Sequence, residues 1–256
     1  MPYRAYTKTD AALPTENFNP ESYAVLLDNV AFAWPGQRRE ILRIQYMAVL
    51  RGEQVFISGP SGSGKSTLLS LVAGILRPSS GEIFVNSVRI TPLSGIARDA
   101  FRGDNIGFIF QQFNLIPYLS VLDNVLIPCR LSAARYHAAT TRFASLENAA
   151  AYFLERLGLE PALWRNRASL LSVGQQQRVA AARALIGSPR LLIADEPTSA
   201  LDADLRQDFL RLLLRECAES GSGLLFVSHD QTLAEKFPRQ IRLTDMNAAG
   251  TREDET

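Results

Sequence analysis

The segment Gly59-Pro60-Ser61-Gly62-Ser63-Gly64-Lys65-Ser66-Thr67 decides the fold of this chain, because it matches the phosphate-loop pattern G-x-x-x-x-G-K-[ST] in full. Residues 53–58, directly before it, contain an apolar run that predicts a buried strand. Residues 65–73 begin a predicted helix. Strand, loop and helix in this order are the context that a phosphate loop requires, so the segment predicts an α/β fold with a phosphate site at a helix N-terminus.

The loop itself supplies most of the predicted nucleotide contacts. Its glycines free successive backbone N–H groups to point into one concavity, which holds phosphate oxygens. Lys65 is expected to reach the β- and γ-phosphates, and the Ser66 hydroxyl is expected to ligate Mg²⁺. The predicted ATP-binding residues of the loop are Gly59, Ser61, Gly62, Ser63, Gly64, Lys65, Ser66 and Thr67.

Two acidic residues end a second apolar run. Residues 191–194 are Leu-Leu-Ile-Ala, and Asp195 and Glu196 follow them. This places both carboxylates at the C-terminal edge of a sheet, where α/β proteins bind ligands. We expect Asp195 to hold Mg²⁺ and Glu196 to polarise the attacking water as a general base. The alternative is that both acids only cap a helix.

A third motif, Leu171-Ser172-Val173-Gly174-Gln175-Gln176-Gln177-Arg178, lies between the loop and the acids. With all three motifs, the chain resembles the ATP-binding cassette (ABC) ATPases from about Tyr23 to Asp245. The usual family motif is L-S-G-G-Q, so Val173 replaces its first glycine. The resemblance implies that Ser172, Gly174 and Gln175 contact the γ-phosphate of an ATP held by a second copy of the chain.

The same resemblance assigns roles to further positions. Gln111, after the predicted strand 106–110, matches the glutamine that contacts Mg²⁺ and the lytic water, and its neighbour Gln112 is the less favoured candidate. His229 matches the switch histidine at the γ-phosphate. Trp34 matches an aromatic residue that stacks on adenine, with core packing as the alternative. The implied catalytic residues are therefore Lys65, Gln111, Glu196 and His229, and the implied metal ligands are Ser66, Gln111 and Asp195.

The organisation of the chain fits this resemblance. Residues 23–27 and 30–34 look like two short strands. After the third motif a helix, the acidic strand, a long helix at about residues 203–220, a strand at 224–227 and a single final helix alternate, which argues for a parallel sheet covered by helices. We expect an α/β P-loop NTPase core of the ABC type, with an N-terminal antiparallel β region and an inserted helical subdomain at about residues 113–170. This domain spans residues 22–246, between a flexible tail at 1–21 and an acidic tail at 247–256.

Composition excludes several classes of function. The 256 residues include 27 basic and 26 acidic side chains, a net charge of +1, which leaves no basic field to hold nucleic acid. Cys129 and Cys217 fit no metal-ligand spacing and are expected to be free thiols. No apolar run approaches the roughly 18 residues of a membrane span, and the N-terminus does not look like a secretory signal.

Two stretches narrow the resemblance to a subclass. Residues 106–117 and 120–125 look like the ATPases of the macrolide-exporter and lipoprotein-release class. That class implies a separate transmembrane permease, driven by mechanical coupling when the ATPase dimer closes on two Mg–ATP at the cytoplasmic face of the inner membrane. Apolar residues exposed on the chain would form the groove for the permease. The candidates are Phe113, Leu115, Ile116, Tyr118 and Leu119.

Two other functions use the same motifs. A cell-division ABC ATPase signals through a membrane partner without transport, and the sequence does not separate it from a transporter subunit. A soluble ABC ATPase of DNA repair or translation usually carries a long coiled-coil insertion or two fused cassettes, and this chain has neither.

Overall fold

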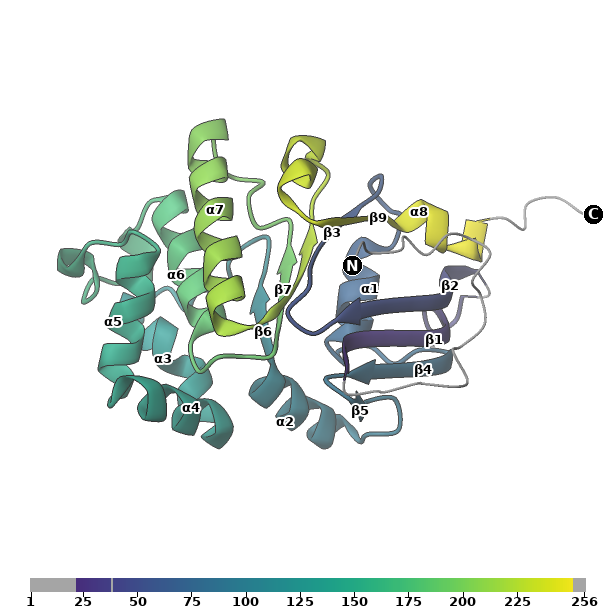
Figure 1. Ribbon diagram of the computed structural model, residues 1–256, viewed down its shortest axis with the longest axis horizontal. Coiled ribbons are helices and arrows are strands. Elements are labelled where there is room, and N and C mark those ends of the chain that lie inside the picture. Colours follow the sequence, from purple (N-terminus) through teal and green to yellow (C-terminus); the bar gives the residue numbers. More distant parts are fainter. Residues whose placement is uncertain (1–21, 38, 251–256) are drawn as a thin grey trace, which may run out of the picture.

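The computed structural model describes residues 22–37 and 39–250, and these form two sheets and a set of helices (Figure 1). One sheet is antiparallel, in the order β2–β1–β4–β5. Its strands are β1 (Tyr23–Ala33), β2 (Glu40–Leu50), β4 (Ser80–Val85) and β5 (Val88–Arg89). This sheet confirms the predicted N-terminal antiparallel region. The predicted tail at 1–21 lies outside the described residues.

The second sheet is parallel throughout, in the order β6–β7–β8–β3–β9. Its strands are β3 (Gln54–Ser58), β6 (Ile106–Ile109), β7 (Leu191–Asp195), β8 (Gly223–Val227) and β9 (Arg239–Arg242). The strand before the phosphate loop, β3, therefore does not pair with the acidic strand β7. Strand β8 lies between them.

Alternating side chains of the parallel sheet belong to two separate hydrophobic cores. In β3, Val55 and Ile57 join the core that includes the antiparallel sheet and α1 (Lys65–Val72), while Phe56 joins the other. Strand β8 divides in the same way, with Phe226 in the second core. Because successive side chains of a strand point to opposite faces, each apolar run covers both faces of the sheet.

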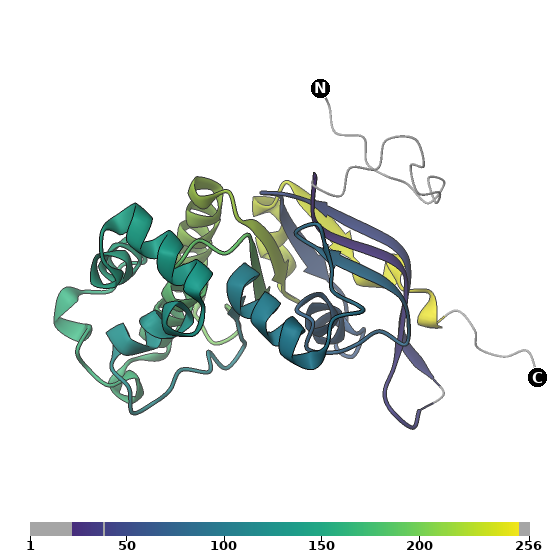
Figure 2. The same ribbon diagram turned by 90° about the horizontal axis from the view of Figure 1, so that it is seen from below.

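The second core is covered by α6 (Val173–Leu185), α7 (Ala203–Ser220) and the helical subdomain, on the side of the parallel sheet away from α1 (Figure 1). The subdomain contains α3 (Val121–Leu131), α4 (Ala133–Phe143) and α5 (Leu146–Arg156). Each begins after a serine, Ser120, Ser132 or Ser145, whose side chain accepts a backbone N–H of the first turn. Figure 2 shows this helical part at the opposite end of the molecule from the antiparallel sheet.

Several elements differ from the sequence-based prediction. The two short strands expected at 23–27 and 30–34 form one strand, β1, with an irregular register between Asp28 and Ala31 and a left-handed residue at Asn29. Strand β2 was not predicted. The prediction of a single helix after β8 was also wrong. After β8 the chain forms the 3₁₀ helix η4 (Gln231–Lys236), β9 and α8 (Leu243–Met246), because Pro238 prevents the helix from continuing.

The packed domain continues past residue 246, where the sequence-based boundary was placed. The Asn247 side chain accepts the Arg43 N–H at 2.8 Å and donates to the Ile41 carbonyl at 2.9 Å. A short 3₁₀ helix, η5 (Ala248–Gly250), follows. Residues 251–256 of the predicted acidic tail lie outside the described part of the chain. Among the described helices, none has the length and hydropathy that a membrane-spanning segment needs.

Candidate nucleotide-binding site

Four of the predicted motifs, those of the phosphate loop, Asp195, His229 and Gln111, lie at the C-terminal edge of the parallel sheet. Strand β3 leads into the phosphate loop, β8 leads to His229, and β7 ends at Asp195. Strand β6 lies beside β7, and Gln111 is an exposed turn residue that follows it. Neighbouring parallel strands thus deliver all four motifs to one edge, which is where open α/β sheets bind ligands.

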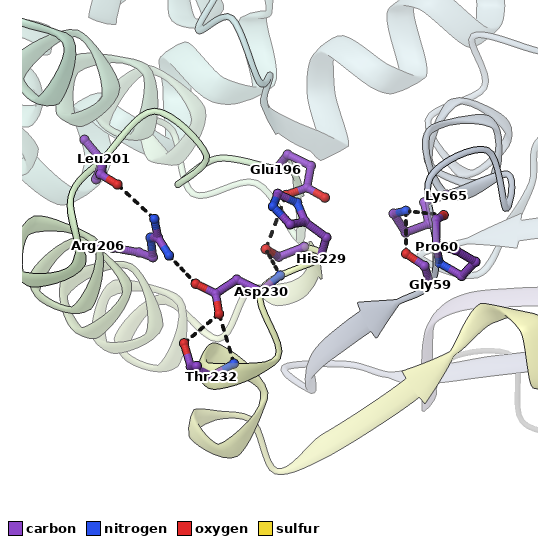
Figure 3. Close-up of polar contacts among 10 residues, drawn as sticks. Gly59, Pro60, Lys65, Glu196, Leu201, Arg206, His229, Asp230 and Thr232 are labelled. Carbon is purple, nitrogen blue, oxygen red and sulfur yellow. Dashed lines mark hydrogen bonds and ion pairs between the residues drawn. The ribbon is translucent and has the colours of Figure 1, made fainter.

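The Lys65 side chain at the end of the phosphate loop is hydrogen-bonded to the start of the same loop. Lys65 Nζ donates to the Gly59 carbonyl at 2.8 Å and to the Pro60 carbonyl at 2.9 Å (Figure 3). Gly64 is the N-cap of α1 and has φ +96°, a conformation that favours glycine. A Cβ there would also lie 2.8 Å from a methyl carbon of Leu42 on β2. The loop conformation therefore depends on glycine at position 64 and on the antiparallel sheet behind it.

Asp195 has the properties of a cation ligand. Its Oδ1 is buried and has no hydrogen-bond partner among residues 22–37 and 39–250. Burial raises the pKa of this carboxyl above its ordinary value, the Ser66 hydroxyl and the Lys65 ammonium oppose the rise, and the charge of Glu196 adds to it. A buried carboxylate oxygen beside a serine hydroxyl is a donor set that suits a hard divalent cation. Ser66 and Asp195 therefore fit the predicted Mg²⁺, and Gln111 lies at the same edge.

Glu196 and His229 form a direct contact. His229 Nδ1 lies 2.9 Å from Glu196 Oε2, and the Ser228 hydroxyl donates to the same oxygen at 3.3 Å (Figure 3). Glu196 has φ +46°, the left-handed region that non-glycine residues seldom adopt, and its N–H donates to the Val227 carbonyl. This backbone conformation turns the carboxylate from β7 toward the segment that follows β8.

An open cavity of about 290 Å³ lies between the phosphate loop and His229. It is lined by Ser58, Gly59, Pro60, Ser61, His229, Gln231 and Arg242. The His229 side chain is 70% exposed, whereas that of Glu196 is 13% exposed. The histidine therefore faces solvent at the rim of the site, and the glutamate lies behind it.

The third motif begins helix α6. Ser172 is its N-cap, and Ser172 and Gln175 form a reciprocal capping box. Val173 is exposed at the first helical position, where a β-branched side chain has no packing role to fill. A Cβ added at Gly174 would meet only ordinary contacts, at 3.6 Å from Leu201 and 3.8 Å from Leu205. The fold of this chain therefore does not require glycine at position 174.

Trp34 lies just beyond the end of β1 and is 41% exposed. Its ring packs edge-on against Phe32 at 5.1 Å between centroids. Phe32 pairs across the sheet with Leu42, the residue that contacts Gly64 of the phosphate loop. The exposed ring surface is compatible with stacking on a base, which stays a prediction.

Two polar residues that the sequence did not single out contact the segment after Glu196. Gln177 is fully buried on α6, and its amide donates to the Pro197 carbonyl. Arg206, on α7, donates to the Leu201 carbonyl and pairs with Asp230. Glutamine and arginine on helices are mostly exposed. The sequence alone therefore could not predict these two contacts.

Comparison with known proteins matches this arrangement. Residues 43–199 match the family described as "ABC transporter". The chain belongs to the ABC transporter family of ATP-binding proteins. It is accordingly an ABC ATPase, and the predicted family, fold class and ATPase activity are confirmed.

Individual relatives cover most of this ABC ATPase. It is 38% identical over 216 residues to the lipoprotein-releasing system ATP-binding protein LolD of Syntrophotalea carbinolica, covering 84% of this chain and 92% of the relative. It is 39% identical over 201 residues to the uncharacterized ABC transporter ATP-binding protein MJ0796 of Methanocaldococcus jannaschii, covering 77% of this chain and 82% of the relative. The dimeric post-hydrolysis structure of MJ0796 bound to ADP and Pi matches with a TM-score of 0.73 and 34% identity, covering 85% of this chain and 93% of that one.

We predict that Asp195→Asn raises the thermal stability of the nucleotide-free ABC ATPase. Because the folded state raises the pKa of Asp195, its charged form destabilises the fold at neutral pH, and this effect fades as the pH falls through that pKa. We expect a Tm about 2–4 °C higher at neutral pH, the shift that about 1 kcal/mol produces in a domain of this size. The difference should shrink toward acidic pH.

The matched control for this measurement is Asp208→Asn, which changes an exposed carboxylate of α7. Its Tm should stay near that of the wild type at each pH. Mg–ATP should raise the Tm of the wild type and of the control, but not that of Asp195→Asn. A lower Tm for Asp195→Asn would show that the carboxylate stabilises the nucleotide-free fold instead.

Proposed function

We propose that this ABC ATPase is the motor subunit of a membrane transporter, in which two copies close on two Mg–ATP and drive a separate permease. The observation that carries the proposal is the contact between Glu196 and His229 at the sheet edge that also carries the phosphate loop. A base and its orienting partner beside a phosphate site are the parts that ATP hydrolysis needs.

This geometry supports the catalytic roles that we propose for the individual residues. Lys65 turns from the Gly59 and Pro60 carbonyls to the β- and γ-phosphates of ATP. Glu196 accepts a proton from the attacking water, and His229 orients its carboxylate. When bound, Mg²⁺ supplies positive charge that neutralises the phosphate oxygens, and Ser66, Asp195 and Gln111 are its proposed ligands.

The second copy completes each site through the N-terminus of α6. Ser172, Gly174 and Gln175 lie on a helix that covers the other face of the parallel sheet from α1. A helix N-terminus binds anions through its free N–H groups. Because this chain's own fold tolerates a side chain at position 174, a strict need for glycine there would arise from a partner's nucleotide. The dimeric structures of MJ0796 support this arrangement.

The permease contact is proposed for the loop that follows Gln111. Arg183 of α6 donates to the Phe113 carbonyl at 2.5 Å and to the Asn114 carbonyl at 2.7 Å. The buried Asn124 amide fixes the next turn through the N–H and the carbonyl of Ile116. Tyr118, on the loop held in this way, is 72% exposed.

The other apolar residues of this loop contribute less surface. Phe113 is 7% exposed and belongs to the second core, and Leu115 packs partly against that core. Ile116 and Leu119 are half-buried. The proposed permease surface is therefore centred on Tyr118.

The relatives support a transporter of the lipoprotein-release class, held at the cytoplasmic face of the inner membrane through its permease. One relative is named a lipoprotein-releasing ATP-binding protein, and another is named an ABC transporter protein. These names do not favour the cell-division or soluble alternatives.

We predict that Glu196→Gln binds ATP but hydrolyses it at least tenfold more slowly, a rise of about 1.4 kcal/mol or more in the barrier. The amide keeps the shape of the side chain but cannot accept the proton. The variant should also accumulate as an ATP-dependent dimer in size-exclusion chromatography. Glu235→Gln, at an exposed position of η4, is the control. Near-normal turnover by Glu196→Gln would remove Glu196 from the role of base.

We predict that Gly174→Ala folds normally but loses at least tenfold in ATPase rate. Alanine fits the helix and meets only ordinary contacts within the chain, so the Tm should be unchanged or slightly higher. The added methyl group would obstruct the nucleotide of the second copy. Gly103→Ala, at an open position of α2 (Gly95–Asn105), is the matched control and should keep full activity. Full activity in Gly174→Ala would argue against the proposed contact between subunits.

We predict that Tyr118→Glu detaches the protein from membranes of its own host without changing ATP affinity. A buried charge in place of the tyrosine ring would weaken the permease contact. The measurement is the fraction that sediments with membranes, together with the Kd for ATP. Tyr136→Glu, at a 50% exposed position of α4, is the control. Equal membrane fractions for the two variants would place the permease surface elsewhere.

A further inference from the structure

Arg206 connects two loops of the active site through one guanidinium group. It lies near the start of α7, whose N-cap is Asp202. Nη2 donates to the Leu201 carbonyl at 2.9 Å, and Nη1 donates to the Asp230 carboxylate in an ion pair (Figure 3). The first acceptor belongs to the loop after the catalytic glutamate, and the second is the residue after His229.

Asp230 in turn fixes the backbone around His229. Its carboxylate accepts the Thr232 N–H at 3.0 Å and the Thr232 hydroxyl at 2.6 Å, and its N–H donates to the Ser228 hydroxyl at 3.1 Å. Ser228 also contacts Glu196. The His229 ring is largely exposed, so its position relative to Glu196 depends on the backbone on either side of it.

The loop on the other side of Arg206, residues 199–202, is connected to the third motif. The Leu201 side chain is 8% exposed. It lies against α6, as shown by the 3.6 Å distance between it and the position that a Cβ at Gly174 would take. Gln177 of α6 holds the preceding Pro197 carbonyl. Any displacement of this loop therefore acts on the Leu201 carbonyl, to which Arg206 is bound.

The chemistry of arginine suits a connection of this kind. Its guanidinium is planar and rigid, so two of its N–H groups keep a fixed separation and direction. The side chain is 27% exposed, and its Nε is buried without a hydrogen-bond partner in the described part of the chain. A partly buried ion pair that is shielded from water resists separation more than an exposed one. Movement of one loop is therefore transmitted to the other instead of being absorbed by solvent.

We propose that Arg206 is a positioning residue that couples the loop 199–202 to His229, so that hydrolysis depends on where this loop lies. The inference rests on the proposed function, in which a second copy of the chain closes over the ATP sites and its nucleotide meets Gly174, against which the Leu201 side chain lies. Arg206 then makes the Glu196–His229 contact conditional on closure, and it does so through its bonds to Leu201 and Asp230.

The test compares Arg206→Gln and Arg206→Lys with a matched control on the same helix. Arg211→Gln removes an arginine that is 77% exposed and pairs only with Asp208 among the described residues. We expect Arg206→Gln to lower kcat at least fivefold, with KM for ATP within twofold of the wild type and a Hill coefficient that falls toward one. Arg206→Lys should recover part of kcat, because one ammonium can serve one of the two acceptors. Arg211→Gln should behave as the wild type.

Further measurements separate positioning from a purely structural role. The Tm of Arg206→Gln should stay within about 2 °C of that of Arg211→Gln, a difference of under about 1 kcal/mol. Asp230→Asn keeps an oxygen for the Thr232 N–H but removes the ion pair, and combining it with Arg206→Gln should slow turnover no further than the slower single variant. In a Glu196→Gln background, Arg206→Gln should still form the ATP-dependent dimer.

Three results would overturn the proposal. They are a kcat for Arg206→Gln equal to that of Arg211→Gln, a loss of kcat that follows the loss of Tm with an unchanged Hill coefficient, and additive effects of Arg206→Gln and Asp230→Asn. Failure of the proposed function gives a different result, because Glu196→Gln would then form no ATP-dependent dimer and the wild type itself would have a Hill coefficient of one.

Discussion

The site depends on the pairing register of three parallel strands, β3, β8 and β7, which aligns their C-terminal ends. Ile57 of β3 pairs with Val227 of β8, and Val227 pairs with Asp195 of β7. Backbone bonds continue this register beyond the strands, from the Glu196 N–H to the Val227 carbonyl and from the Ser228 N–H to the Ile57 carbonyl. Because the strands end at one level, the phosphate loop, the histidine and the acids emerge side by side.

The parallel sheet separates the phosphate loop from the third motif, because the helices that carry them lie on opposite faces of it. Helix α1 and the antiparallel sheet cover one face, and α6 and α7 cover the other. Each chain therefore carries its phosphate loop and its third motif on helices that a core of buried strands keeps apart. This separation explains why a chain with every motif is still expected to work as a pair, and why contacts such as Gln177 to Pro197 are needed to connect the two halves.

Local patterns in the sequence predicted the elements that carry the motifs. The strand before Gly59, the helix from Ala203 to Ser220 and the pair Asp195–Glu196 were all readable, because apolar runs and capping residues act over a few positions. Strand β2 and the single course of β1 were not, because their pairing depends on residues far apart in the chain. Burial could not be predicted from the sequence either. Phe113 and Tyr118 are both aromatic residues of the same segment, but Phe113 lies in the core and Tyr118 is exposed.

The lysine that closes the phosphate loop has a consequence for the nucleotide-free state. With Nζ bound to two carbonyls of the same loop, the loop is preorganised before ATP arrives. Binding then exchanges one set of hydrogen bonds for another and orders little additional backbone, so the entropic penalty of association is small. The exchange also makes binding selective for ligands that carry several anionic oxygens. A ligand with few anionic oxygens cannot replace two good acceptors, and adenosine without its phosphates would leave this lysine where it is.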